Sequence, residues 1–178
     1  SLVMQSGLRS AIAAILVLAW ARVRHIPLWE RDRTLKPGLV AGTAFALEFA
    51  LIYGGLGFTT ASRMIVFLYL APSLTALGVS LCVPGERLSA TQWAGVLLAF
   101  GGVAIAFLDG FLAATGSTFI GDAMGALAAL LWAATTVVIR TTSLARASAT
   151  KVLFYQLAAS AVLLLLWSRL IGEPGRQL

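Results

Sequence analysis

The segment from Leu39 to Phe58 consists almost entirely of apolar and small residues, with one charged side chain, Glu48, near its middle. A run of about 20 such residues spans the ~30 Å hydrocarbon core of a bilayer as an α-helix. The segment does not alternate apolar and polar residues as a strand of a membrane barrel does. It therefore predicts a transmembrane helix with Glu48 near the membrane midplane, where a carboxylate costs at least ~2.5–3.5 kcal/mol.

The rest of the chain has the same character. Of its 178 residues, 60% are hydrophobic and 11% are charged, whereas soluble domains contain about 25% charged residues. The net charge of +6 does not indicate a nucleic-acid partner, because the basic residues lie in short segments between apolar runs rather than on one amphipathic face. We predict an all-α, polytopic membrane protein in contact with lipid.

Six membrane spans are predicted, separated by turn-forming segments such as Lys36 to Gly38 and Pro84 to Arg87. Their ranges are 2–21, 39–58, 63–83, 91–108, 121–139 and 152–171. Ser89 and Gln92 have the spacing of a capping box, which predicts a helix start just before the fourth span.

Lys and Arg are concentrated in the segments that this topology puts on one side of the membrane. These are Arg22, Arg24, Arg31, Arg33, Lys36, Arg87, Arg140, Arg146 and Lys151, against Arg63, Arg176 and the border residue Arg169. The positive-inside rule assigns the richer side to the cytoplasm.

The first and last spans resemble each other at one constant offset. Arg9 aligns with Gln156, Trp20 with Trp167, and Arg22 with Arg169. Five spans separate the start of one copy from the other, so the copies cross the membrane in opposite directions. Inverted repeats of this kind are typical of transporters, whose substrate site lies near the midplane between the repeats.

Several segments resemble the EamA-type branch of the drug/metabolite transporter superfamily. They are Tyr53 to Arg63 (YGGLGFTTASR), Phe67 to Ser73 (FLYLAPS), Pro84 to Leu88 (PGERL), Gly95 to Val103 (GVLLAFGGV) and Gly121 to Trp132 (GDAMGALAALLW). The resemblance implies ten helices in two inverted five-helix repeats, of which this chain would be a fragment covering helices two to seven. Residues 1–108 would be the last four helices of the first repeat, 109–120 the inter-repeat loop, and 121–178 the first two helices of the second.

The resemblance also implies a function. Members of the family move small organic metabolites, amino acids or drugs, commonly outward, without a cofactor. We expect a multi-pass protein of the bacterial inner (plasma) membrane that works by alternating access.

Glu48 and Arg9 are the charged candidates inside the spans. Glu48 would couple transport to protons or bind a cationic group, since a neutral acid is cheaper to occlude than a carboxylate. Arg9 would hold an anionic group of the substrate or lie at the interface. Alternatively, the two form a salt bridge that only aligns helices, because their depths of ~10 and ~15 Å from the outer ends of their spans are within reach of an Arg side chain.

The other candidates are polar or aromatic residues at similar depth. Tyr69, Pro72, Ser73 and Ala76 share one helical stripe, in which Pro72 would kink the helix toward a cavity that Tyr69 and Ser73 line. Trp132 would form a cavity wall or pack against a helix, and Gln156 would contact substrate or a neighbouring helix.

An intramembrane enzyme and a membrane scaffold are the two alternatives to a transporter. An intramembrane enzyme is disfavoured, because the only histidine, His25, lies between spans, and Asp109 and Asp122 lie at span ends. A metal enzyme would lack ligands. A non-transporting membrane scaffold, with Glu48 in a structural salt bridge, remains an alternative.

Overall fold

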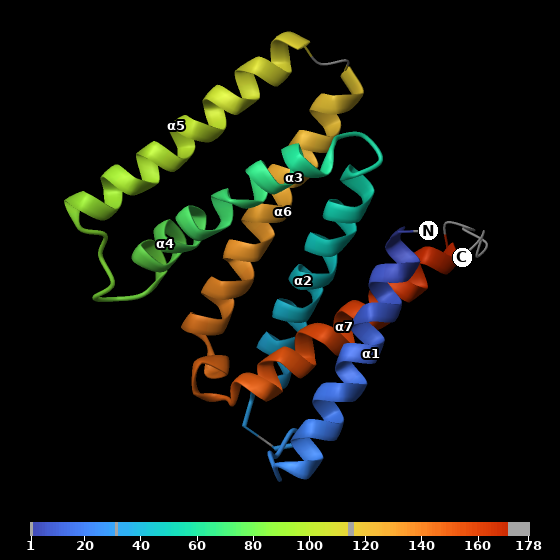
Figure 1. Cartoon of the computed structure of the whole chain (residues 1–178). Coiled ribbons are helices and arrows are strands. Elements are labelled where there is room, and N and C mark those ends of the chain that lie inside the picture. The colour runs from blue at the N-terminus through green and yellow to red at the C-terminus, as the bar shows by residue number, and fades with distance from the viewer. Residues whose placement is uncertain (1, 31, 114–115, 171–178) are drawn as a thin grey trace.

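The computed structural model describes residues 2–30, 32–113 and 116–170, and this part of the chain is all-helical (Figure 1). The helices are α1 (Leu2–Val23), α2 (Leu35–Gly55), α3 (Ala61–Leu68), α4 (Leu70–Cys82), α5 (Ala90–Ala113), α6 (Gly116–Thr141) and α7 (Ala149–Leu170), with a short 3-10 helix, η1 (Ser143–Arg146), between the last two.

Five stretches of helix are long and apolar enough to cross a membrane. They are α1, α2, α3 with α4 (Ala61–Cys82), Thr118–Thr141 within α6, and α7. The predicted span 91–108 lies in α5, where Ala90–Ile105 is a shorter apolar helix. The polytopic helical membrane fold is confirmed.

The predicted span 63–83 is divided into two helices that meet at Tyr69. The interruption falls three residues before Pro72. A proline inside a helix has no N–H to donate to the carbonyl four residues earlier, here that of Leu68, and its ring crowds that carbonyl. The helix is therefore weakest in the turn that precedes Pro72, which is where α3 ends.

The expected loop 109–120 is helical at both ends, because α5 continues to Ala113 and α6 begins at Gly116. Its glycine, serine and threonine residues suggested a loop, but these residues only lower helix stability by fractions of a kcal/mol to about 1 kcal/mol each. The apolar residues among them continue the helices on either side. The division of the chain into two repeats stays a prediction.

α2 lies beside α6 and α7, and small residues let these helices approach closely (Figure 1). A Cβ atom added at Gly42 would lie 2.6 Å from the Cβ of Ala159 and 2.8 Å from the carbonyl oxygen of Tyr155. One added at Gly38 would lie 2.5 Å from the ring of Tyr155. Lipid offers no hydrophobic incentive for helices to associate, so such close contact is what holds them together.

α1 packs along α7. Gly7 lies against Leu165, and the buried hydroxyls of Ser10 and Ser160 are 3.1 Å apart and hydrogen-bonded. On the other side of the molecule, Phe67, Leu70 and Ala71 of α3 and α4 form an apolar cluster with Ala129 of α6. α5 joins this cluster through Phe100 and Val103 and otherwise runs apart from α1, α2 and α7 (Figure 1).

The connections 24–34, 83–89 and 142–148 all lie toward the lower left of Figure 1, and the opposite helix ends lie toward the upper right. The Lys- and Arg-rich segments therefore share one end of the helices, as predicted. The predicted capping box is also present: Ser89 N–H donates to Gln92 Oε1 at 2.9 Å, and Gln92 N–H donates to Ser89 Oγ at 3.3 Å.

Candidate functional site

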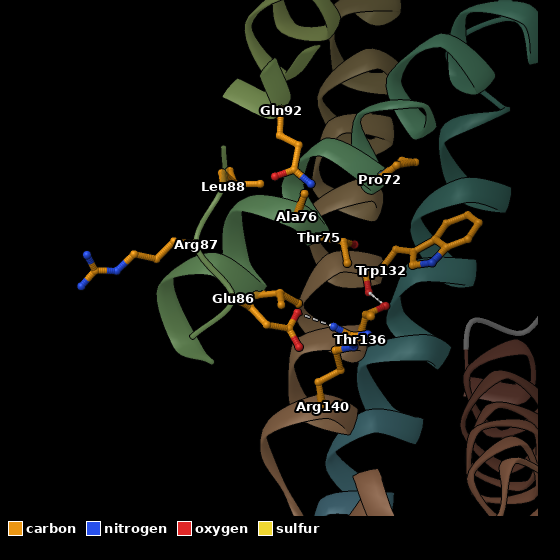
Figure 2. Close-up of a pocket in the computed structure, with 11 residues that line it drawn as sticks. Pro72, Thr75, Ala76, Glu86, Arg87, Leu88, Gln92, Trp132, Thr136 and Arg140 are labelled. Carbon is orange, nitrogen blue, oxygen red and sulfur yellow. Dashed lines mark hydrogen bonds and ion pairs between the residues drawn. The ribbon is translucent and has the colours of Figure 1, made fainter. Parts of the chain in front are cut away.

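A cavity of about 690 Å³ lies between α4, the α4–α5 connection and α6. We call it the Pro72 cavity, and Figure 2 shows its lining residues. They are Pro72, Thr75, Ala76, Val79, Glu86, Arg87, Leu88, Gln92, Trp132, Thr136 and Arg140.

Helix periodicity explains which residues line the Pro72 cavity. On α4, the positions from Pro72 to Val79 that face it follow the spacing i, i+3, i+4, i+7. On α6, Trp132, Thr136 and Arg140 follow one another at every fourth residue, so they too share a face. The wall thus runs from the interior of both helices to the end that carries the Lys- and Arg-rich connections.

The polar groups of the Pro72 cavity lie mostly toward that end. Arg140 Nη1 donates to Glu86 Oε2 at 2.6 Å, which joins the α4–α5 connection to the last turn of α6 (Figure 2). Deeper in the cavity, the Thr136 hydroxyl donates to the carbonyl of Trp132 at 3.2 Å. The cavity therefore combines an aromatic and apolar wall with an ion pair at the end nearest the Lys- and Arg-rich connections.

A second cavity of about 530 Å³ adjoins the first. It lies between the α4–α5 connection, the end of α6, η1 and the start of α7, and it includes Gln156, so we call it the Gln156 cavity. Glu86 and Arg140 line both cavities. Their ion pair is therefore the boundary between the two.

The six predicted site residues do not meet in one midplane cavity. Trp132 lines the Pro72 cavity together with the predicted kink residue Pro72, while Gln156 lines the second cavity. Tyr69 is 72% exposed at the junction of α3 and α4, and Ser73, although half-buried, is not among the described residues that line either cavity. The expected stripe of four is therefore divided, since Pro72 and Ala76 line the Pro72 cavity and Tyr69 and Ser73 do not.

Arg9 lies elsewhere, in a small cavity of about 180 Å³ between α1, α2 and α7. Its Nη1 atom donates to the hydroxyl of Tyr53 at 2.8 Å. Phe45, Phe49 and Tyr53 line the same cavity, and their rings contact one another in sequence along α2. Arg9 is therefore placed beside an aromatic face rather than beside Glu48.

Glu48 is buried, with 4% of its surface exposed. Ala41 and Gly55 lie two helical turns on either side of Glu48, so the three share a face of α2. Gly55 lies against Met124 and Gly121 of α6, and Ala41 belongs to a cluster that includes Val138 of α6. Glu48 therefore lies on the face of α2 that packs against α6.

The candidate salt bridge between Arg9 and Glu48 is not among the ion pairs of the residues that the structure describes. Thr135, one turn before Val138, is also buried, and its hydroxyl has no hydrogen-bond partner within the described ranges. Buried polar groups nearly always have partners, so exceptions call for an explanation. Glu48 of α2 and Thr135 of α6 are thus buried polar residues within membrane-spanning helices.

Two ion pairs that sequence reasoning missed tie distant parts of the chain together. At one end, Arg63 of α3 forms a bidentate pair with the buried Asp122 of α6, and the Thr59 hydroxyl donates to Asp122 Oδ1 at 2.9 Å. We call these three residues the Asp122 cluster. The sequence pattern places Asp122 at a span end and gives no sign of its partners.

At the opposite end, the buried Lys151 of α7 donates from Nζ to Asp32 Oδ2 at 2.8 Å. The Thr34 hydroxyl donates to Asp32 Oδ1 at 2.6 Å and pairs with the Tyr155 hydroxyl at 3.2 Å. The hydrogen bond from Lys151, followed by that from Thr34, lowers the pKa of Asp32 to about 2. We call these four residues the Lys151 cluster.

Glu86 and Arg140 were also missed as a pair. Glu86 belongs to the PGERL motif, and Arg140 was counted only for orientation. They are 54 residues apart, so no local spacing could have joined them. Within the described ranges, no group of three His, Cys, Asp or Glu side chains converges as a metal site would require.

Comparison with known proteins identifies one family. A model of the EamA-like transporter family matches residues 1–108. No curated protein and no solved structure matches the chain.

Proposed function

The chain belongs to the EamA-like transporter family, and we propose that it exports small organic metabolites, amino acids or drugs by alternating access. It is an integral, multi-pass membrane protein, and membrane transport in general follows from the family. The substrate class, the direction and the mechanism are the parts that we propose.

The Pro72 cavity is the observation that carries the proposal. Its volume of about 690 Å³ falls within the ~300–1,000 Å³ of small-molecule sites, which combine apolar and aromatic walls with a few polar groups. Trp132 offers an aromatic surface, and Thr75 and Thr136 offer hydroxyls. These groups fit a compact organic solute better than a bare ion.

The position of the Pro72 cavity supports alternating access. It lies between α4 and α6, which the proposed division assigns to the first repeat (1–108) and the second repeat (121–178). Rocking of one repeat against the other would change the access to a cavity between them. The interruption at Tyr69 gives α4 a point about which it can move relative to α3.

Glu48 is the proposed site of proton coupling. It lies buried on the α2 face that meets α6, which is also an interface between the proposed repeats. A protonated carboxyl group can be enclosed there at lower cost than a carboxylate. Alternating access requires two arrangements of α2 against α6. Protonation of Glu48 would then stabilise one of these arrangements relative to the other.

The orientation that we propose follows from charge. The end of the helices that carries the Lys- and Arg-rich connections would face the cytoplasm, in the inner (plasma) membrane of a bacterium. The end of the Pro72 cavity that Glu86 and Arg140 line would then lie nearest the cytoplasm. A solute to be exported would enter from that side.

The test is an untargeted comparison of small molecules in cells and medium, with the protein in its full-length form at matched membrane expression. Trp132→Ala should reduce the export of any solute that wild type releases. Trp167→Ala is the matched control, since Trp167 is as exposed as Trp132 but lines neither cavity. Glu48→Gln should make the export rate independent of external pH.

A wild-type strain that releases no solute beyond the empty vector would contradict the proposal. Equal export by wild type and Trp132→Ala would mean that the substrate-binding site is not in the Pro72 cavity. A rate that is independent of both external pH and the charge at residue 48 would remove the proton-coupling role and leave the transporter.

A further inference from the structure

We propose that the ion pair of Glu86 and Arg140 is a gate between the Pro72 cavity and the Gln156 cavity. Both residues line both cavities, and their charged atoms are 2.6 Å apart. The pair therefore lies between Gln156 in the second cavity and Trp132 in the first. Breaking the pair joins two cavities of about 690 and 530 Å³ into one continuous path.

The two residues come from parts of the chain that can move relative to each other. Arg140 lies in the last turn of α6, where a cation is favoured by the helix dipole. Glu86 lies in the short connection between α4 and α5, directly after Gly85, whose φ of 92° is readily adopted only by glycine. The connection is anchored near Glu86 by single hydrogen bonds, from Glu86 N–H to Val83 and from Leu88 N–H to Ser80.

The side chains of the connection differ in direction. In Figure 2, Glu86 points toward Arg140, whereas the guanidinium of Arg87 points away from it. Among the described residues of this connection, Glu86 alone makes an ion pair with α6. The closing contact therefore depends on one carboxylate, and Arg146, an exposed cation that lines neither cavity, offers a matched control.

The exposure of the pair suits a reversible contact. The side chains of Glu86 and Arg140 are 49% and 51% exposed, so water can solvate both charged groups when they separate. In the Asp122 and Lys151 clusters, by contrast, one partner of each pair has only 2% of its side chain exposed. Separating those pairs would leave a buried charge without a partner. The Glu86–Arg140 pair is thus the one suited to open and close among the ion pairs of the described residues.

The gate rests on the proposed function for its role in transport, but it can be tested without a transported solute. The intact protein, with Cys82 replaced by Ser and Thr75→Cys as a reporter in the Pro72 cavity, is reconstituted in vesicles of known orientation. A membrane-impermeant maleimide is added on the side of the Lys- and Arg-rich connections. The labelling rate measures access to the cavity from that side.

We expect Glu86→Gln and Arg140→Gln each to raise the labelling rate about fivefold or more. The charge swap, Glu86→Arg with Arg140→Glu, should return the rate to that of wild type, which a general loss of structure would not do. Arg146→Gln removes an exposed cation at the same end of the helices, outside both cavities, and should leave the rate unchanged.

The gate is overturned if neither single variant changes the labelling rate, or if the charge-swapped protein is labelled as fast as the single variants. An equal increase with Arg146→Gln would also overturn it, because net charge rather than the pair would then control access. A protein that exports no solute yet shows the expected rates would contradict the proposed function and retain the gate.

Discussion

The glycines of α2 and those of α5 have opposite surroundings. Where α2 meets α7, a Cβ at Gly38 or Gly42 would lie within 2.6 Å of the facing helix. On α5, a Cβ at Gly95, Gly101 or Gly102 would meet nothing within 4 Å. The same residue type thus marks a tight helix contact on one side and an open helix surface on the other.

The difference shows that a small residue permits close approach but does not cause it. In a membrane, helices associate through close van der Waals contact and interhelical hydrogen bonds. α2 meets complementary shapes in Tyr155 and Ala159, whereas α5 is held by Phe100 and Val103 against the cluster around Phe67. The Pro72 cavity borders α5 through Gln92, whereas the Gln156 cavity extends to the start of α7.

The ion pairs follow the same division. The Asp122 and Lys151 clusters bury one partner at the two ends of the packed helices, while the exposed Glu86–Arg140 pair lies at the cavities. The pairs at the packed helices thus each bury one partner, whereas both partners of the pair at the cavities are exposed.

The largest effect is expected from adding bulk at the α2–α7 contact. Gly42→Leu should destabilise the protein by about 3 kcal/mol or more, because even a Cβ would overlap Ala159 and the backbone of Tyr155. Gly101→Leu, on the open face of α5, should leave the thermal unfolding midpoint in detergent nearly unchanged. Equal losses in the two variants would mean that the two sides do not differ in packing.

A smaller effect is expected at the Asp122 cluster. Asp122→Asn removes the charge that Arg63 pairs with, at a cost of about 1.5–3 kcal/mol for hydrogen bonds to a charged group. Arg63→Gln should cost a similar amount, and the double variant should cost less than the sum of the two. A double-mutant cycle by thermal unfolding measures this coupling, and additive losses would contradict the pair.

The smallest effect concerns pH at the Lys151 cluster. The pKa of Asp32 is lowered from 3.8 to about 2, so its contribution to stability is present above pH ~4 and is lost as pH falls through about 2. The stability difference between wild type and Asp32→Asn should stay constant from pH 8 to pH 5 and shrink below pH 4. A difference that changes between pH 8 and pH 5 would require another titrating group.

Much of the fold was predictable because membrane spans depend on local composition. The apolar runs placed α1, α2, α6 and α7 to within a few residues, and the Ser89–Gln92 spacing predicted the start of α5. The interruption at Tyr69 was not predicted, since Pro72 indicates a weakened turn but not the residue at which the helix ends.

The candidate site was harder to predict, because its residues come together only by packing. Trp132 and Pro72 were singled out one by one and line one cavity, but Gln156, Arg9 and Tyr69 lie in other places. Depth along a span is readable from sequence. The rotation of each helix, which decides the direction of every side chain, depends on its neighbours.

The sequence by itself determined that this chain is a bundle of membrane helices with one charge-rich end and an acid inside, since the cost of polar groups in lipid acts residue by residue. Only the tertiary structure decided that Glu48 faces α6 and that Lys151 meets Asp32. It also decided that Glu86 contacts Arg140 at the boundary between the two cavities. These contacts join residues far apart in the chain, and they form when helix shapes fit together, which no local pattern encodes.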